Sequence, residues 1–363
     1  MDLTDLRKRL TEVDQKLIEL IAERQSIVDE VGAFKRTVGR ATRDYAREKQ
    51  VIDGARDRAS ALGLAPELAE QVMHLLIRSS LTKQERARVK AEGQGSGKKA
   101  LVIGGAGKMG QWFVNFLDSQ GFHVTIADPD AHDEGLPVIK RWQDAGNDFA
   151  VTVIATPLGA TADLLEEMAG SGWNGLVFDV GSLKSPLIEG LRKMAANGIH
   201  VTSLHPMFGP DTELLSDKHV LFLDAGSAEA TAEARQLFAS TMAQQTEMSL
   251  EDHDRLIAYV LGLSHAINIA FFTVLADSGE AVPRLANISS TTFDAQLDVA
   301  TRVANENPRL YFEIQSLNQF GLEPLQGLLE AVEKIAASVK ARDEEAFVKL
   351  MQSGRAYLDT RVD

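Results

Sequence analysis

Cysteine is absent from the 363-residue chain. A chain without thiols forms no disulfide, no thiolate zinc site and no cysteine nucleophile, so a reducing, cytoplasmic compartment is expected. Long apolar runs are lacking as well, because no uninterrupted stretch approaches the ~20 residues that a membrane-spanning helix needs. The first residues are charged, which is not typical of a signal peptide. We therefore expect no membrane partner.

Positive charge is scarce over most of the chain. The formal net charge is −14, yet residues 1–98 hold 19 Lys and Arg against 16 Asp and Glu, a net of +3, which leaves −17 for the remainder. An acidic body disfavours nucleic acid as a partner, since phosphate binding needs clustered basic side chains. With 44% apolar residues over this length, two or three domains are expected.

Glycines gather at residues 100–110, where the composition of the chain changes. A short apolar strand runs into glycines with the G-x-G-x-x-G spacing of a dinucleotide-binding turn, and a helix follows. A pyrophosphate would lie at the helix N-terminus, although glycine-rich strand ends also occur as plain turns. The predicted cofactor-binding residues here are Gly105, Gly107, Lys108, Met109 and Gly110.

A carboxylate follows the next apolar run. That run, 122–127, ends at Asp128, about 20 residues beyond the glycines, where an acidic side chain can hold the adenosine ribose hydroxyls. Neither Pro129 nor Asp130 offers a cation for a 2'-phosphate. The pattern favours NAD over NADP as cofactor, and we expect no metal.

The first 90 residues have a helical pattern. Apolar side chains recur at three- and four-residue steps from Leu3 to Phe34, which predicts one long amphipathic helix over about 2–37. Shorter helices are expected over about 44–61 and 66–90. So few helices cannot bury the stripe of the long one, and this predicts a homodimer.

Polar side chains in this segment fall into sets that face one way. Arg24 and Lys35 lie three turns apart and share a face near the apolar stripe. The other sets lie at one-turn spacing on the second and third helices and comprise Asp44, Arg47 and Glu48, then Ser80 and Gln84. For any one of these residues, an ordinary surface position is the simpler interpretation.

The motifs that contain these residues resemble the all-helical chorismate mutases. They are L-R-K-R-L-T-E-V-D-x-K-L, A-E-R, V-G-x-x-K, R-D-Y-A-R-E-K and S-S-L-T-K-Q, in order and at family spacing over residues 1–90. The resemblance implies rearrangement of chorismate to prephenate, a pericyclic reaction that needs only binding and stabilisation. It implies that Arg7 of the partner's long helix joins Arg24 and Arg47 around the two substrate carboxylates.

The same resemblance implies roles for the remaining polar residues. Lys35 and Gln84 would flank the ether oxygen, which gains negative charge as its bond breaks. Glu48 would accept from the ring hydroxyl, with Asp44 and Ser80 nearby. A different reading makes this segment a non-catalytic module for dimerisation or ligand sensing.

Residues 91–98 are small and polar and predict a flexible linker. Beyond it, apolar runs alternate with helical stretches, which is typical of a nucleotide-binding α/β sheet over 99–246. Further strands are predicted over 149–155, 175–179, 199–204 and 219–223.

Ligands of such sheets gather where strands end. Thr156 and Pro157 lie at one such end, as a cofactor-facing turn or a plain one, and Ser182 lies at another. His205 lies on a proline- and glycine-bounded loop that ends at Asp211. Imidazole exchanges protons near neutrality, so His205 could polarise or deprotonate a hydroxyl that gives up hydride.

The motif D-x-x-S-x-K followed by L-H-P-M-F-G-P-D resembles prephenate dehydrogenases, over about residues 99–363. The resemblance implies that His205 hydrogen-bonds the 4-hydroxyl of prephenate, while Ser182 orients the histidine and touches the nicotinamide. Hydride transfer would then trigger loss of carbon dioxide and aromatisation. Asp211 is expected near the mouth of the substrate site, and a solvated loop carboxylate is the alternative.

Residues 247–363 have a helical pattern nearly to the end. The helix over about 256–272 is apolar on more than half its surface, so it is expected to be buried on most sides. It contains His265, for which a core position and a site role are evenly matched, and the resemblance supports substrate contact. His253 is expected to face solvent without a role.

The resemblance also assigns Arg302, which matches the arginine that binds the ring carboxylate of prephenate. Asp294 departs from the family, since some relatives carry arginine there, and this leaves a secondary substrate or inhibitor contact in doubt. Helical extensions of this kind commonly interlock into dimers in this dehydrogenase group.

Three domains are therefore expected. They are an all-α chorismate mutase domain over 1–90, an α/β Rossmann-type NAD domain over 99–246 and an all-α substrate and dimerisation domain over 247–363. The expected function is a bifunctional enzyme of tyrosine biosynthesis, with chorismate and prephenate as substrates and tyrosine as a plausible feedback inhibitor. The alternative is an arogenate dehydrogenase with a non-catalytic N-terminal module.

Overall fold

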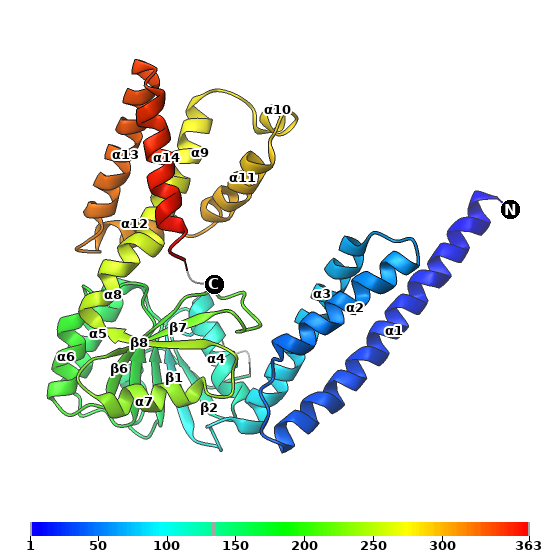
Figure 1. Ribbon diagram of the computed structural model, residues 1–363. Helices are drawn as coiled ribbons and strands as arrows, with labels where there is room; N and C mark the ends of the chain where they lie inside the picture. Colours follow the sequence, from blue (N-terminus) through cyan, green and yellow to red (C-terminus); the bar gives the residue numbers. More distant parts are fainter. Residues whose placement is uncertain (1, 133–134, 362–363) are drawn as a thin grey trace. The chain divides into compact units, whose positions relative to one another are not determined.

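The computed structural model describes residues 2–132 and 135–361 of the chain. It forms two compact units (Figure 1). One unit comprises Met1–Gly181 and Glu189–Met248, and the other comprises Ser182–Ile188 and Ser249–Asp363.

Three helices form the start of the first unit: α1 (Leu3–Thr37), α2 (Tyr45–Ala61) and α3 (Pro66–Glu92). Side-chain caps fix where the first two begin, because Asp2 forms a capping box with Asp5, and Asp44 accepts from the backbone N–H of Arg47. Pro66 opens α3, where its missing N–H costs nothing. The three predicted helices are confirmed, with α3 two residues longer than expected.

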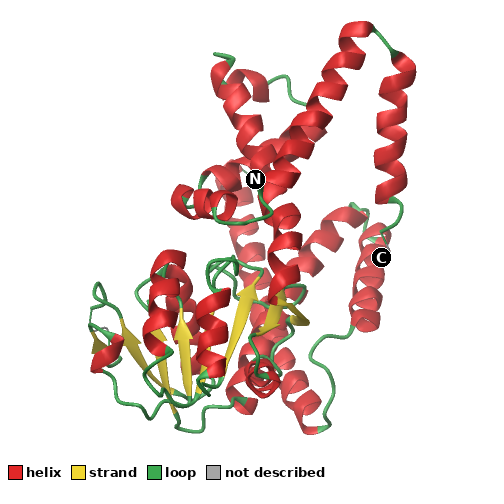
Figure 2. Cartoon of the chain, turned by 90° about the vertical axis from the view of Figure 1, so that its left-hand side faces the viewer, coloured by secondary structure: helices red, strands yellow, loops and turns green. Residues whose placement is uncertain are grey.

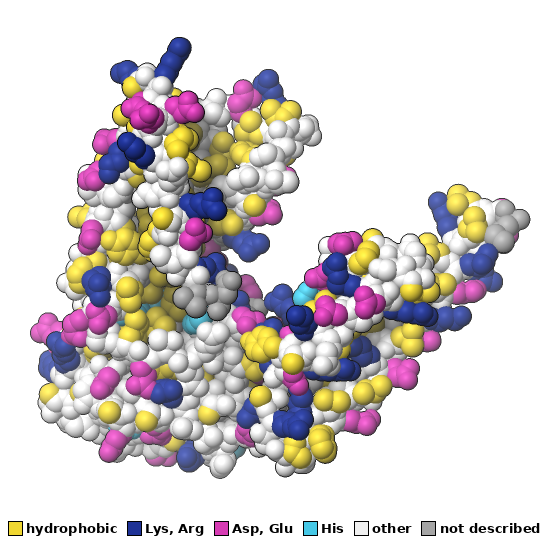
Figure 3. Space-filling view, in the orientation of Figure 1, with side chains coloured by type: hydrophobic (Ala, Val, Ile, Leu, Met, Phe, Trp, Pro, Cys, Tyr) yellow, Lys and Arg dark blue, Asp and Glu magenta, His cyan; other side chains and the backbone are white. Residues whose placement is uncertain are grey.

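The apolar stripe of α1 is uncovered in the single chain. Along the described length of α1 only Gly32 is buried, and Leu3, Leu10, Leu17 and Phe34 are exposed. Figure 3 shows apolar side chains in yellow at the surface of the helical parts of the chain. A stripe of this length needs a second surface to cover it.

The join between the helices and the sheet is packed, so the expectation of a flexible linker over 91–98 is wrong. The α3 helix runs on to Glu92, and backbone hydrogen bonds from Gly95 and Gly97 reach Gln120 and Gly121. A Cβ on Gly95 would lie 2.3 Å from the carbonyl carbon of Gly121. The small residues are there because backbone passes closely over backbone.

An eight-stranded sheet follows, in the order β3-β2-β1-β4-β5-β6-β7-β8. The pairings from β3 across to β6 are parallel, and β7 pairs antiparallel with β6. The first six positions reproduce the strand order of dinucleotide-binding folds, whose crevice opens where the order reverses, between β1 and β4. The strands are β1 (Lys99–Ile103), β2 (His123–Ala127), β3 (Val138–Ile139), β4 (Val151–Ile154), β5 (Leu176–Asp179), β6 (Val201–Pro206), β7 (His219–Asp224) and β8 (Gln244–Ser249).

Helices cover the sheet, as Figure 2 shows in red beside the yellow strands. They are α4 (Lys108–Ser119), α5 (Leu158–Met168), α6 (Ile188–Ala196) and α7 (Ala228–Leu237). The sequence did not reveal β3, which has two residues, or β8, whose Gln-Gln-Thr-Glu-Met-Ser run is polar and largely exposed.

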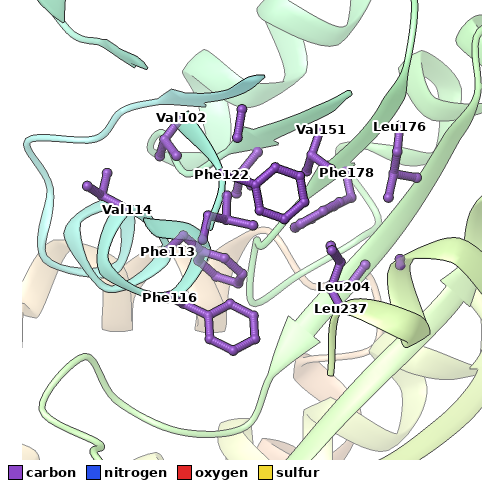
Figure 4. Close-up of a cluster of buried hydrophobic side chains, with 14 of the residues drawn as sticks. Val102, Phe113, Val114, Phe116, Phe122, Val151, Leu176, Phe178, Leu204 and Leu237 are labelled. Carbon is purple, nitrogen blue, oxygen red and sulfur yellow. The ribbon is translucent and has the colours of Figure 1, made fainter. Parts of the chain in front are cut away.

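The core of the first unit lies between the sheet and α4. Phe113 of α4 meets Phe178 of β5, with the two ring centroids 5.9 Å apart, and Phe116 of α4 belongs to the same cluster (Figure 4). Val89, near the end of α3, belongs to the same cluster. The last helix of the N-terminal segment is therefore anchored in the core of the α/β domain.

The second unit is helical. Its α8 (Leu250–Ile257) continues through a π-helical turn, η2 (Ala258–Leu263), into α9 (Ser264–Asp277). The remaining helices are α10 (Val282–Ala286), α11 (Thr291–Ala304), α12 (Pro308–Ser316), α13 (Leu322–Ala341) and α14 (Glu344–Leu358).

The expectation that the helix over 256–272 is buried on most sides is wrong for a single chain, since Leu256, Tyr259 and Val260 are exposed. The continuous helix Leu250–Asp277 is long and apolar enough to cross a membrane by length and composition alone, with 22% of its apolar window buried. One such helix is weak evidence for a membrane, because helices that soluble proteins cover by assembly meet the same criteria.

Candidate active sites

The three N-terminal helices and the loop between α1 and α2 line an open cavity of about 500 Å³. Seven of the eight polar residues that the sequence assigns to the mutase site line it, together with apolar side chains such as Ile27 and Ile77. The seven are Arg24, Lys35, Asp44, Arg47, Glu48, Ser80 and Gln84. The cavity therefore combines cations, for an anionic ligand, with apolar walls that fit a ring.

The cations of the cavity are held in place by their neighbours. Arg24 donates from Nη1 to the Ser80 hydroxyl at 2.5 Å and to the carbonyl of Leu76 at 3.2 Å. Lys35 donates from Nζ to the carbonyl of Thr42 at 2.6 Å. Thr42 is buried in the cavity wall, a role that nothing in the sequence pattern indicated.

Gln84 is the one buried amide of the cavity. Its Oε1 has no hydrogen-bond partner among the residues that the structure describes. A buried polar atom without a partner costs free energy unless a ligand supplies the contact. The position of Gln84 in the cavity is therefore suited to a ligand with polar atoms.

Arg7 lies outside the cavity, on the exposed part of α1. At ~1.5 Å of rise per residue, Arg7 lies roughly 25 Å along the helix from Arg24. A chain cannot bring its own Arg7 to this cavity while α1 is one straight helix. Its assignment to a partner subunit's site stays a prediction.

The glycine loop between β1 and α4 is tightly folded. A Cβ on Gly104 would lie 2.7 Å from the carbonyl oxygen of Ala155, and one on Gly110 would lie 2.1 Å from that of Gly104. Gly107 precedes the first turn of α4, which begins with Lys108 and Met109. Exposed N–H groups at the start of a helix are the arrangement that binds pyrophosphate.

Asp128 lies beside that loop, at the end of β2. Its carboxylate accepts the backbone N–H of Ala106 at 3.1 Å and that of Asp130 at 2.9 Å. Thr156 and Pro157 follow the end of β4, which pairs with β1 on the side opposite to β2. Pro157 directly precedes α5. The carboxylate, the loop and the helix start thus lie where a dinucleotide would bind, and the residues present fit NAD.

His205 is buried in β6, where its register partner on β7 is Leu221. The segment 207–218 leads from β6 to β7 and carries Asp211, which is exposed and borders a cavity between this segment and α3. The sequence placed His205 on the loop after a strand, but β6 runs on to Pro206, so His205 lies within the carboxyl end of the strand itself. Asp211 lies at the surface, close by in the chain.

The segment that carries Ser182 belongs to the second unit, where Asp254 holds it. The Asp254 carboxylate accepts the backbone N–H of Lys184 at 2.9 Å and of Ser185 at 2.6 Å, and also the Ser185 hydroxyl. Burial raises the pKa of Asp254, but these hydrogen bonds and one from His253 outweigh it and hold the pKa below its ordinary value.

His253 corrects an expectation. It was expected to face solvent between two aspartates, but it is fully buried, and its Nδ1 lies 2.6 Å from the Asp254 carboxylate. The charged pattern Glu-Asp-His-Asp at the helix start suggested an exposed segment. Glu251 and Asp252 are indeed exposed, but His253 and Asp254 face the interior. Helical spacing from buried Leu250 and Ile257 was the available signal.

His265 is the second residue after the π-helical turn, a feature that often marks functional positions. Its ring stacks on Tyr311 with centroids 4.0 Å apart. Burial lowers the pKa of His265 and favours the neutral ring, and its Nδ1 has no hydrogen-bond partner within the described chain. A neutral imidazole with one uncommitted buried nitrogen is suited to contact a polar ligand atom.

Two charged residues that the sequence singled out lie on α11. Arg302 is exposed in the last turn of α11. Asp294, in the first turn, accepts a hydrogen bond from the Ser289 hydroxyl. Asp294 therefore helps to hold the start of α11, which gives it a local structural contact.

Family models match three consecutive parts of the chain. Residues 6–85 match chorismate mutase type II. Residues 117–245 match the nucleotide-binding domain of prephenate dehydrogenase, and residues 249–353 match its dimerization domain.

Two relatives align with nearly the whole chain. The T-protein of Enterobacter agglomerans is 26% identical over 96% of this chain and 90% of its own length. The T-protein of Haemophilus influenzae is 24% identical over 98% of this chain and 92% of its own length. The crystal structure of prephenate dehydrogenase from Aquifex aeolicus, solved with hydroxyphenyl propionate and NAD+, covers 74% of this chain and all of that one, with 18% identity and a TM-score of 0.57, and so shares the fold.

Proposed function

The chain belongs to the bifunctional enzymes that join chorismate mutase to prephenate dehydrogenase, and on that premise we propose which residues carry its two reactions. The enzyme rearranges chorismate to prephenate and oxidises prephenate with NAD in tyrosine biosynthesis. The product of the first reaction is thus the substrate of the second.

We assign the mutase reaction to the cavity between α1, α2 and α3. The single observation that carries this assignment is that seven residues from three helices, spread over 60 positions of sequence, line one cavity. Arg24 and Arg47 bind the substrate carboxylates, and Lys35 and Gln84 stabilise the charge that develops on the ether oxygen. Glu48 accepts from the ring hydroxyl, with Asp44 and Ser80 beside it.

We assign the dehydrogenase reaction to His205, with Ser182 orienting it. NAD, when bound at the glycine loop, supplies the acceptor for the hydride that leaves the carbon bearing the 4-hydroxyl. His205 takes the hydroxyl proton, and the ring carboxylate, bound by Arg302, leaves as carbon dioxide. His265 and Asp211 contact the substrate.

The preference of this second site for prephenate over the related arogenate is the finer part of the proposal. We propose prephenate, because the first domain makes it, and arogenate is the alternative. A comparison of kcat/KM for the two substrates with NAD decides between them, since a clear preference for arogenate would overturn the assignment. Tyrosine inhibition, measured in the same assay, would identify a feedback effector.

We propose that the enzyme is a cytoplasmic homodimer in which α1 of one chain covers α1 of the other. The uncovered apolar stripe of α1 and the exposed face of α9 support this assembly. In such a dimer, Arg7 of one chain would reach the mutase cavity of the other chain, which that chain's own Arg7 cannot reach.

Subunit mixing tests that arrangement. Arg7→Ala and Arg24→Ala each remove one cation from the mutase site, and a heterodimer of the two variants keeps one intact site if Arg7 acts across the dimer. Random exchange should then restore about a quarter of wild-type mutase activity. If the mixture stays as inactive as the separate variants although exchange is complete, Arg7 does not act in the partner's site.

A further inference from the structure

Arg43, in the loop between α1 and α2, joins carboxylates from both catalytic domains. Its Nε donates to Glu48 Oε1 at 3.1 Å, and its Nη2 donates to Glu48 Oε2 at 3.1 Å. Its Nη1 donates to the carboxylate of Asp217 at 2.5 Å. One guanidinium thus spans the wall of the mutase cavity and a segment of the dehydrogenase domain.

The whole guanidinium is fixed by its surroundings. Besides the two carboxylates, Nη1 donates to the Ser216 hydroxyl at 2.6 Å, and the Cζ atom lies 4.2 Å from the centroid of the Tyr45 ring. Burial lowers the pKa of Arg43, but Glu48 and Asp217 outweigh it and raise the pKa above its ordinary value. A planar group with partners on every edge keeps one orientation.

Asp217 belongs to the segment 207–218, which starts two residues after His205. Its backbone has φ +62, the left-handed region that side chains other than glycine, asparagine and aspartate seldom adopt. Glu85 of α3 holds the same segment, because its buried carboxylate accepts the backbone N–H of Leu215 at 2.8 Å. Asp217 is therefore presented to Arg43 by a docked loop.

We propose that Arg43 is a positioning residue of the mutase site, and that Asp217 of the dehydrogenase domain anchors it. The inference rests on the proposed role of Glu48. Glu48 shares its cavity with Arg24, Lys35 and Arg47, the cations that bind the substrate. Without Arg43, the carboxylate of Glu48 would pair with one of these cations. The site would then lose the acceptor for the ring hydroxyl and also a cation that binds a substrate carboxylate.

The first test is Asp217→Asn in the full chain. Asparagine keeps the size of the side chain and tolerates the left-handed backbone, so only the charge is removed. We expect mutase kcat/KM to fall about 5- to 10-fold, because a small displacement of a binding group is costly in a tight site. NADH formation from added prephenate should not change.

The matched control is Asp148→Asn in the same domain. Asp148 pairs with Lys99 at 2.5 Å, and its side chain is 63% exposed, as that of Asp217 is. The ion pair lies outside the mutase cavity, so this variant should leave both activities unchanged. A mutase loss equal to that of Asp217→Asn would mean that general surface charge is responsible and would overturn the proposal.

The decisive test is a double-mutant cycle. Arg43→Gln should lower mutase kcat/KM by about 10- to 100-fold, and Arg43→Lys should rescue little because an ammonium cannot replace the fork. In the Arg43→Gln background, Asp217→Asn should have no further effect if Asp217 acts through Arg43. Independent, multiplying effects would overturn the inference.

Failure of the proposed mutase function gives a different result. If Glu48→Gln retains wild-type mutase activity, the role of Glu48 is wrong, and the inference falls with it. If Glu48→Gln is impaired while Asp217→Asn and Arg43→Gln match the wild type, the mutase site stands and only the anchoring role is overturned.

Discussion

A Cβ added to Gly32 of α1 would lie 3.0 Å from Cγ of Gln84 on α3. The buried glycine therefore makes room for the side chain that we assign to the ether oxygen of chorismate. Two helices approach closely at this point because one of them has no side chain there.

Gly32→Ala separates stability from catalysis. Alanine favours a helix interior by up to about 1 kcal/mol over glycine, so the thermal stability of the protein should stay the same or rise. The new methyl group forces Gln84 to move by a few tenths of an ångström, and mutase kcat should fall about 10-fold. Steady-state kinetics and thermal unfolding of one preparation check both.

Gly54→Ala is the control for that variant. Gly54 lies within α2, and among the described residues no atom besides its chain neighbours and the backbone of its own helix lies within 4 Å of the Cβ that it would carry. The Gly54→Ala variant should have a higher thermal stability than the wild type and the same mutase activity. Equal activity losses in the two variants would refute the link between Gly32 and Gln84.

The identity of residue 84 sets the pH dependence of the mutase. An amide donates at any pH, so wild-type mutase kcat should be nearly flat from pH 5 to 8. A glutamate there donates only when protonated, so Gln84→Glu should lose activity as the pH rises through that range. A steep loss for the wild type itself would remove Gln84 from the mechanism.

His205→Asn tests the dehydrogenase alone. The variant keeps a hydrogen-bonding side chain but cannot take the hydroxyl proton, so dehydrogenase kcat should fall roughly 100-fold or more. Mutase activity in the same preparation should be unchanged and serves as the folding control. Unchanged NADH production from prephenate would exclude His205 as the base.

Arg302→Gln should act on binding. It removes a carboxylate contact that is present in ground and transition states alike, so KM for prephenate should rise while kcat changes less. Arg284→Gln on α10 offers a comparison, because Arg284 is exposed and pairs locally with Glu280. A fall in kcat at constant KM would assign Arg302 to the chemical step instead.

Asp254→Asn should weaken the second unit and the segment that carries Ser182. Because the pKa of Asp254 is lower folded than unfolded, its stabilisation is present above pH ~4 and is lost as the pH falls through the folded value. At pH 7 the loss of the hydrogen bonds to this buried charge should cost about 1.5–3 kcal/mol. Chemical unfolding at pH 7 measures it, together with the loss of dehydrogenase activity.

Acid provides the internal check on Asp254. The difference in stability between Asp254→Asn and the wild type should shrink below pH ~4, where the carboxyl of the unfolded wild-type chain begins to bind a proton while that of the folded chain is still ionised. Asp298→Asn, at an exposed position on α11, should show no such dependence. A difference that persists unchanged into acid would mean that shape and not charge matters at position 254.

Periodicity and motif spacing predicted much of this molecule. The helix of residues 3–37, the strand before the glycine loop and the convergence of Arg24 with Glu48 and Gln84 all follow from local pattern and family spacing. Such features depend on residues close in sequence or on motifs whose order is informative by itself.

Contacts between distant segments could not be predicted in this way. His253 was misjudged because its charged neighbours hide a buried face, and the packing of Gly95 on Gly121 depends on where two loops meet. The bridge from Arg43 to Asp217 joins two residues that are more than 170 positions apart in sequence. The periodicity of a sequence does not indicate which charged side chains form an ion pair when they come from distant segments.

The most direct test of the two-site account gives chorismate to the purified full chain, first without NAD and then with it. Chorismate loss and NADH formation are followed separately. We predict that chorismate disappears without NAD, and that NADH appears only when NAD is added. If chorismate persists without NAD while added prephenate still yields NADH, the N-terminal helices are not a mutase and the account is wrong.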